Sequence, residues 1–157
     1  MTIKLLAIGK TDDKDLQKLI DQYFNRLKHY CKFEIEIIPD IKKTKKLDES
    51  LQKLKEGELI LSKTNPSDLL VLLDENGKSF SSVGYSNWLQ KQMNTGMKQL
   101  IFVIGGPYGF SEEVYKRANQ KISLSSMTFS HQMVRLFFTE QLYRAFTILK
   151  NEPYHHQ

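Results

Sequence analysis

The stretch from Ile101 to Phe110 constrains the fold of this chain more than any other part of it. It reads IFVIGGPYGF, four consecutive apolar residues followed by a loop that contains three glycines. An apolar run without polar alternation is typical of a strand covered on both faces, as in a parallel sheet. Glycines let a backbone turn sharply and approach a ligand closely, and open α/β sheets bind ligands outside the carboxyl ends of their strands. The stretch therefore predicts either a ligand-binding loop or a plain tight turn into the next helix.

The glycine loop does not match the common phosphate-binding motifs. The P-loop pattern, with its lysine and hydroxyl residue after the last glycine, is absent, and so is Gly-x-Gly-x-x-Gly. Pro107 also removes one backbone donor from the middle of the loop, which weakens any cradle for a phosphate. A cofactor held by shape and a few backbone groups fits this loop better than a nucleoside triphosphate.

Strands and helices are expected to alternate along the whole chain. Apolar runs and apolar–polar alternation predict strands at residues 2–8, 33–38, 68–74, 101–104 and 122–124. Helical spacing and capping residues predict helices at residues 12–30, 47–61, 82–94, 111–119 and 131–150. Such alternation predicts an α/β fold, a mostly parallel sheet with helices on both faces. The length favours a single domain covering residues 1–157.

Three local features refine this prediction. Apolar and acidic residues alternate over residues 33–38, which indicates a half-buried strand near a sheet edge. Residues 74–78 are expected to form an acidic turn with Gly77 as its hinge. Ser130 is expected to cap the last helix, whose apolar residues cover more than one stripe. That helix should be buried against the sheet on one side and against a second subunit on the other.

Composition narrows the class of protein. The formal net charge is +5, a mild bias toward polyanions. Cys31 is the single cysteine, so an intrachain disulfide is impossible and a reducing, cytoplasmic location is expected. The apolar runs are too short for a membrane span, and the start of the chain is expected to be a strand rather than a signal segment.

The densest run of charge is Lys42-Lys43-Thr44-Lys45-Lys46. It is interpreted either as a solvated loop or as a contact with a phosphate backbone. Contacts of the second kind are independent of sequence and weaken as salt rises.

Three loops should meet at the carboxyl ends of the strands: Leu73-Asp74, Gly105-Gly106 and residues 124–129. Together they predict a pocket of backbone and apolar groups, suited to a flat, uncharged ring such as adenine. The polar residues expected nearby are His131, Arg135 and Glu140. Each of these also has a purely structural interpretation: His131 as a helix-start residue bonded to backbone, and the other two as an ion pair or as solvated side chains. Neither a metal-ligand pattern nor a Gly-x-Ser-x-Gly elbow is present.

Several motifs in fixed order resemble one known family. They are Leu72-Leu73-Asp74, Ile104 to Gly109, Leu124 to Phe129, His131-Gln132-Met133-Val134-Arg135, Glu140 to Ala145, and the ending Tyr154-His155. On these motifs the chain is similar to the ribosomal large subunit methyltransferase H family, of the SPOUT class of methyltransferases. The likeness runs from Ile3 to His155. One departure is Ser130, where the family usually has proline; serine is a good N-cap, so the helix start should survive.

The resemblance implies more than the residue patterns do. It implies a C-terminal trefoil knot, which periodicity does not predict because knots are nearly absent among folds. It implies S-adenosyl-L-methionine bound by Leu73, Gly105 and a loop of six residues: Leu124, Ser125, Ser126, Met127, Thr128 and Phe129. It implies a homodimer with its active site at the subunit interface, neither metal-dependent nor membrane-bound. The implied reaction is methylation of N3 of a pseudouridine in helix 69 of 23S rRNA, within the assembled 70S ribosome.

Chemistry suggests roles for four residues. The target nitrogen attacks best once its proton is lost, so a base and a group that stabilises negative charge are needed. His131 or His155 is the expected proton acceptor, because histidine titrates near neutral pH. Arg135 is expected to stabilise the anion, and Tyr154 to stack on the base or hydrogen-bond to it. Lys42 to Lys46 and Arg144 are candidates for docking the ribosome.

Two other functions stay open at this point. One is a SPOUT-type enzyme that acts on tRNA. The other is a non-catalytic, dimeric RNA-binding module that has kept the fold.

Overall fold

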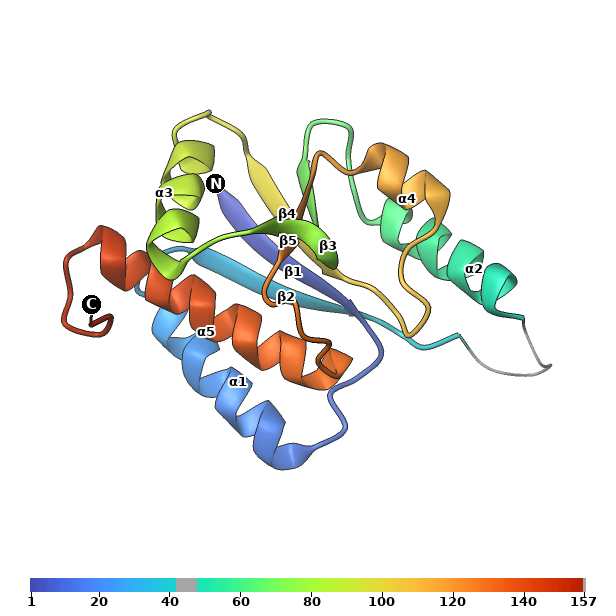
Figure 1. Ribbon diagram of the computed structural model, residues 1–157, viewed down its shortest axis with the longest axis horizontal. Helices are drawn as coiled ribbons and strands as arrows, with labels where there is room; N and C mark the ends of the chain where they lie inside the picture. The colour runs from blue at the N-terminus through green and yellow to red at the C-terminus, as the bar shows by residue number, and fades with distance from the viewer. Residues whose placement is uncertain (42–47, 157) are drawn as a thin grey trace.

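The computed structural model describes residues 1–41 and 48–156. Strands and helices alternate strictly over these residues (Figure 1). The strands are β1 (Thr2–Ile8), β2 (Lys32–Ile38), β3 (Leu69–Ser79), β4 (Gln99–Ile104) and β5 (Gln120–Ser123). The helices are α1 (Lys14–Leu27), α2 (Glu49–Ser62), α3 (Ser82–Met93), α4 (Glu112–Arg117) and α5 (His131–Leu149). The predicted alternation is confirmed.

The strands of the described residues form one sheet in the order β2-β1-β4-β3-β5, and every neighbouring pair is parallel. Strand β2 lies at one edge, as its alternating sequence predicted. The interior strands carry the apolar runs, and Leu100, Ile101, Phe102 and Val103 of β4 are fully buried. Parallel strands covered on both faces account for such runs.

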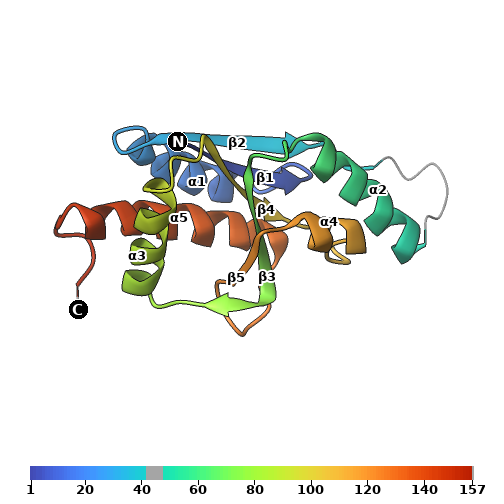
Figure 2. The ribbon, with the colours of Figure 1, turned by 90° about the horizontal axis from the view of Figure 1, so that it is seen from above.

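Helices cover both faces of the sheet. Helices α1, α3 and α5 pack on one face around an apolar cluster that includes Phe102, Phe138 and Leu142. Helices α2 and α4 cover the other face, around Ile60, Phe110 and Val114. Figure 2 shows the two groups on opposite sides of β3, β4 and β5. The α/β class with helices on both faces is therefore confirmed, and the trefoil knot remains a prediction from the resemblance.

Side chains cap the helices where the sequence indicated. The side chains of Asp13, Ser81, Ser111 and Ser130 each accept a hydrogen bond from a backbone N–H in the first turn. Asp48 does the same for α2, so this helix begins at Glu49 rather than at residue 47. Satisfying these otherwise unpaired donors stabilises each helix start by about 1 kcal/mol. Helices α1 and α4 end at Leu27 and Arg117, two or three residues earlier than predicted.

The prediction of an acidic turn hinged at Gly77 is wrong. Strand β3 continues to Ser79, and residues 74–77 form a bulge, because Leu73 and Lys78 both pair with Ile122 of β5. Asp74 accepts a hydrogen bond from the Asn76 backbone at 2.8 Å, a local turn that the sequence pattern did indicate. Gly77 has no positive φ. A methyl group placed on it would lie 2.6 Å from the Ile122 nitrogen, so glycine is needed for close approach of two backbones.

Candidate functional site

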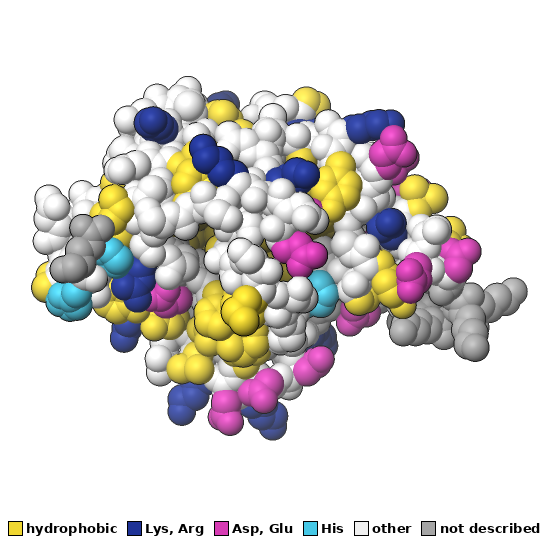
Figure 3. All heavy atoms as spheres, viewed as in Figure 1, with side chains coloured by type: hydrophobic (Ala, Val, Ile, Leu, Met, Phe, Trp, Pro, Cys, Tyr) yellow, Lys and Arg dark blue, Asp and Glu magenta, His cyan; other side chains and the backbone are white. Residues whose placement is uncertain are grey.

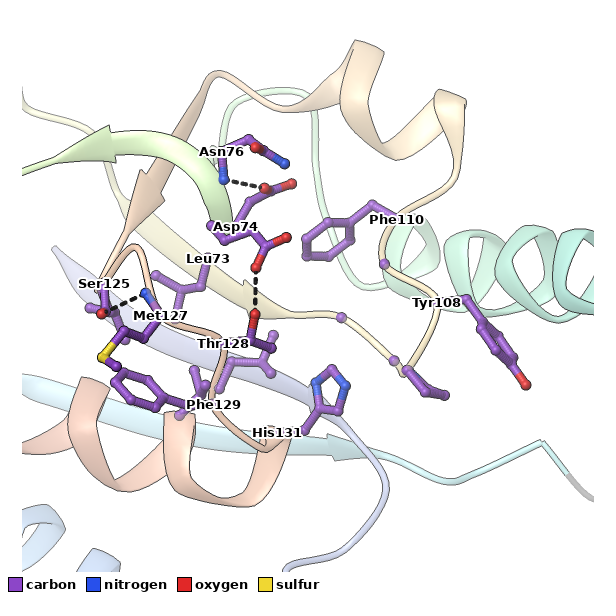
Figure 4. A pocket seen from close by; sticks show the side chains of 18 of the residues that line it. Leu73, Asp74, Asn76, Tyr108, Phe110, Ser125, Met127, Thr128, Phe129 and His131 are labelled. Carbon is purple, nitrogen blue, oxygen red and sulfur yellow. Dashed lines mark hydrogen bonds between the residues drawn. The ribbon is translucent and has the colours of Figure 1, made fainter.

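A cavity of about 370 Å³ lies beside the bulge of β3 and at the carboxyl ends of β4 and β5. Its size is within the range of small-molecule sites. Three segments form its walls: the β3 bulge, the glycine loop after β4, and the loop between β5 and α5 (Figure 4). The predicted convergence of three loops is therefore seen. Of the residues predicted to bind cofactor, those that line the cavity are Leu73, Gly105, Leu124, Ser125, Met127, Thr128 and Phe129. Ser126 does not line it.

The glycine loop forms a tight turn in which a side chain would be unfavourable at two of its glycines, Gly105 and Gly109. The Gly109 nitrogen donates to the Gly106 carbonyl at 3.1 Å, and Gly109 has a φ of +81°, which favours glycine. The ring of Phe110 packs against Gly105, so closely that a methyl group there would lie 3.1 Å from the ring. Ser111 then caps α4. The loop is thus closed at both ends, and its backbone forms one wall of the cavity.

The loop between β5 and α5 is fixed by its own hydroxyl groups. Ser125 accepts a hydrogen bond from the Met127 nitrogen at 3.0 Å, and Ser123 donates to the Ser125 carbonyl at 2.9 Å. Thr128 donates to a carboxylate oxygen of Glu75 at 2.9 Å, which joins this loop to the β3 bulge. Figure 4 shows Ser125 bonded to Met127 within the loop, and Thr128 bonded to a carboxylate of the β3 bulge. The two walls therefore hold each other in place.

Sequence reasoning missed Glu75 and Tyr115, which also line the cavity. Tyr115 donates to Asp74 at 2.6 Å. Burial, and then this hydrogen bond, raise the pKa of Tyr115 to about 12, so it remains a donor at neutral pH. The contacts of both residues join segments that lie 41 and 53 positions apart, and no local pattern reports such pairs.

His131 is the first residue of α5 and lies at the rim of the cavity (Figure 4). Loss of hydration, and then the positive charge of Arg135, lower the pKa of His131 below its usual value. The neutral imidazole that results can accept a proton. Ser130 caps the helix here by accepting from the Met133 nitrogen at 3.2 Å, so the departure from proline leaves the helix start intact.

Arg135 is buried and does not line the cavity. Its guanidinium donates to the Ile8 carbonyl at 2.8 Å and to the Thr11 hydroxyl at 3.1 Å. Burial lowers its pKa, an effect that the nearby Asp12 and Asp40 oppose. The alternative of an ion pair between Arg135 and Glu140 is wrong, because Glu140 pairs with Arg144.

Tyr154 and His155 follow the C-terminal end of α5 and fold back against the second half of this helix. The Tyr154 hydroxyl donates to Glu140 at 2.9 Å, and Arg144 contacts His155 at 3.2 Å. Their partners Glu140 and Arg144 lie 9 and 13 residues after His131, about 14 and 20 Å along the helix, so within one chain Tyr154 and His155 do not meet His131. Figure 1 shows the C-terminus at the far end of the molecule from the start of α5.

Apolar side chains are exposed beside the cavity. Met127 is 74% exposed and Phe137 is 36% exposed, and the rings of Phe129 and Phe137 lie 4.8 Å apart. Apolar side chains gather over α5 on this face (Figure 3). A surface of this kind, next to a cavity, is typical of a protein interface.

Within residues 1–41 and 48–156, no group of three or more histidine, cysteine, aspartate or glutamate side chains is arranged to hold a metal ion. None of the described helices is long and apolar enough to cross a membrane. Cys31 lies between α1 and β2 and packs against the core, where burial raises its pKa to about 12 and leaves it an unreactive thiol.

Comparison with known proteins matches nearly the whole chain. A family profile described as predicted SPOUT methyltransferase covers residues 1–155. A protein of Christiangramia forsetii named ribosomal RNA large subunit methyltransferase H is 76% identical over 157 residues, the full length of both chains. Proteins with the same name from Flavobacterium johnsoniae and Parabacteroides distasonis are 72% and 62% identical, again over the full length of both chains.

Proposed function

We propose a reaction for this chain on the premise that it belongs to the SPOUT methyltransferase family, within the group of the ribosomal RNA large subunit methyltransferases H. The chain transfers a methyl group from S-adenosyl-L-methionine to 23S rRNA of the large ribosomal subunit. The acceptor is N3 of a pseudouridine in helix 69, and the substrate is the assembled ribosome in the cytoplasm. One observation carries this proposal: a cavity built from three loops, with the imidazole of His131 at its rim.

The residues of the cavity fit the cofactor. Its walls offer apolar surface from Leu73, Leu124 and Phe129 and backbone groups from the glycine loop, which suits an adenine ring. Glu75 and Asp74 supply negative charge at the β3 bulge, which suits a cationic methyl donor. The bound cofactor supplies a methyl group activated by its sulfonium sulfur.

The residues of the chain then have three tasks. The cavity walls place the target nitrogen in line for attack, which is the main requirement of such a transfer. His131 or His155 accepts the N3 proton as the N–C bond forms and the S–C bond breaks. Within one chain Arg135 does not touch the cavity. Its contribution is a positive potential beside His131, which stabilises the negative charge on the target pseudouridine after its proton is lost.

A homodimer completes the site in this proposal. The exposed apolar surface at Met127 and Phe137 is the natural contact for a second copy. Antiparallel packing of two α5 helices would bring Tyr154 and His155 of one copy to the cavity of the other. This arrangement accounts for a tail that packs against Glu140 and Arg144 and does not reach His131 in its own chain.

The candidate residues for docking the ribosome are Lys42 to Lys46 and Arg144. The run Lys42 to Lys46 lies outside the described residues. Arg144 already contacts Glu140 and His155. Each lysine that contacts a phosphate should add about 0.7–0.9 to the slope of log affinity against log salt. Replacing Lys42, Lys43, Lys45 and Lys46 by glutamate should lower ribosome methylation and flatten that slope. Unchanged methylation would reject the run as a docking site.

The test uses ribosomes from cells that lack any such enzyme. Purified protein and labelled S-adenosyl-L-methionine are added to assembled ribosomes, separated subunits, naked rRNA or tRNA. Transfer only to assembled ribosomes, mapped to a pseudouridine of helix 69, is the expected result. Methyl transfer to tRNA would show that the proposed substrate is wrong, whereas the proposed methyl-transfer reaction would stand. An absence of both transfer and cofactor binding would favour the RNA-binding module.

A further inference from the structure

Helix α2 supports the glycine loop at both of its ends, through two adjacent residues. At the start of the loop, the carboxylate of Glu56 lies against Gly106: a methyl group placed on Gly106 would overlap one carboxylate oxygen and lie 2.7 Å from the carboxyl carbon. At the end of the loop, Gly57 packs against Ser111, the cap of α4. One turn of α2 therefore contacts both boundaries of a cavity wall.

Glu56 is unusual for a carboxylate on a surface helix. It is only 3% exposed. One oxygen accepts from the Gln52 side chain at 3.0 Å, whereas the other is buried without a hydrogen-bond partner. A buried polar atom of this kind destabilises a fold, and burial raises the pKa of the Glu56 carboxyl. An apolar residue at this position would stabilise the fold more than a buried carboxylate does. Core packing alone therefore does not explain why a glutamate is found here.

The backbone of Gly106 explains why the contact matters. Gly106 has no positive φ, so its conformation is open to any residue type. A side chain at this position is excluded because Glu56 already occupies the space beside the Gly106 Cα. Gly106 therefore differs from Gly109, whose backbone itself favours glycine. The carboxylate of Glu56 therefore lies between α2 and the backbone of the loop.

We propose that Glu56 is a positioning residue that holds the Gly105–Gly109 loop in the conformation that binds cofactor. It acts through Gly106 and does not line the cavity. The proposal rests on the proposed function, because it takes the cavity to be the S-adenosyl-L-methionine site.

The contact can be tested by a double-mutant cycle. The variants are Glu56→Ala, Gly106→Ala and the two combined, with Glu56→Gln to preserve the shape of the side chain. Glu58→Gln, an exposed carboxylate on the same helix, is the matched control. Cofactor binding is measured by calorimetry, unfolding by heat, and KM separately for cofactor and for ribosomes.

Gly106→Ala should weaken cofactor binding about tenfold, the scale of coupling between residues in contact. Removing Glu56 makes room for the new methyl group, so the double variant should bind cofactor more tightly than Gly106→Ala alone. Glu56→Ala should raise KM for cofactor and leave KM for ribosomes unchanged, and Glu56→Gln should restore much of the affinity.

The outcomes separate the two proposals. If the unmodified protein does not bind S-adenosyl-L-methionine, the proposed function fails. If it binds, but the effects of Glu56→Ala and Gly106→Ala simply add, the positioning role is overturned. A lowered unfolding temperature of Glu56→Ala with unchanged cofactor affinity would also overturn it, since Glu56 would then serve stability alone.

Discussion

Arg135 donates a hydrogen bond to the backbone carbonyl of Ile8 at 2.8 Å and so joins α5 to the carboxyl end of β1. The same guanidinium contacts Thr11 at 3.1 Å. Gln132 adds to this link: its amide donates to the Lys10 carbonyl at 3.0 Å and accepts from the Asp12 nitrogen at 3.2 Å. The loop after β1 is therefore fixed to the start of α5, next to His131.

Arg135→Ala should lower the free energy of unfolding by about 2–4 kcal/mol, because it leaves a buried carbonyl without its charged donor. Thr11→Val removes only the weaker contact and should lower it by about 1 kcal/mol. Urea denaturation measures both. A loss below about 0.5 kcal/mol for Arg135→Ala would contradict a structural role and leave only the catalytic one.

The pH dependence of methyl transfer should report His131. Its pKa in the folded protein is below the ordinary histidine value of about 6.5, so the base stays available as pH falls below 6.5. The unfolded chain binds more protons in that window, so His131 lowers the stability of the fold as pH falls through it. His131→Gln should remove both effects. If kcat/KM already fell as the pH was lowered to a value above 6.5, the assignment of His131 as the proton acceptor would be contradicted.

Gly77→Ala tests the close approach of β3 and β5. The added methyl group meets the backbone of Lys121 and Ile122 at 2.6 Å, and strand backbones cannot rotate away as side chains can. We expect a loss of about 2–3 kcal/mol in the free energy of unfolding. Gly84→Ala, in helix α3, is the control and should be neutral or stabilising by up to about 1 kcal/mol. Equal effects of the two substitutions would contradict the inferred contact.

Local patterns predicted most of the fold. The caps at Ser111 and Ser130 could be predicted because a helix cap depends on residues only three positions apart. The edge position of β2 could be predicted because alternation of apolar and polar residues indicates a strand buried on one face. Gly77 was misread for a related reason. Its neighbourhood resembles a turn, but the constraint comes from β5, more than 40 residues later, and a sequence pattern does not contain that information.

The same distinction applies to the candidate site. Leu73, Gly105 and the loop before α5 could be placed together because strand ends in a parallel sheet share one edge. The burial of Arg135 could not be predicted, because helix spacing puts it on the same side as His131 without saying which surface receives it. Glu56 carried no signal at all, since a glutamate on an amphipathic helix is ordinarily exposed.

Phe137→Glu should convert the protein to a monomer if α5 forms the subunit contact. Phe137 is partly exposed and its ring lies 4.8 Å from that of Phe129, so a charge there would be buried without a partner in a dimer. Sedimentation velocity measures the mass, and the monomer should lose methyl transfer. Leu59→Glu, an exposed apolar position on α2, is the control and should leave the mass unchanged. A dimeric Phe137→Glu variant would place the interface elsewhere.

Two inactive variants should restore activity to each other if each site is built from two copies. His131 lies at the cavity, whereas His155 lies at the other end of α5, beside Arg144. A heterodimer of His131→Ala and His155→Ala subunits then contains one site with both defects and one site with neither. Purified through a different tag on each subunit, it should show about half the activity of the unmodified dimer, provided that both sites turn over independently. Heterodimers of two His131→Ala subunits, prepared with the same tags, are the control and should stay inactive. If each site instead used both histidines from a single chain, every site of the mixed dimer would carry one defect, and activity would not recover.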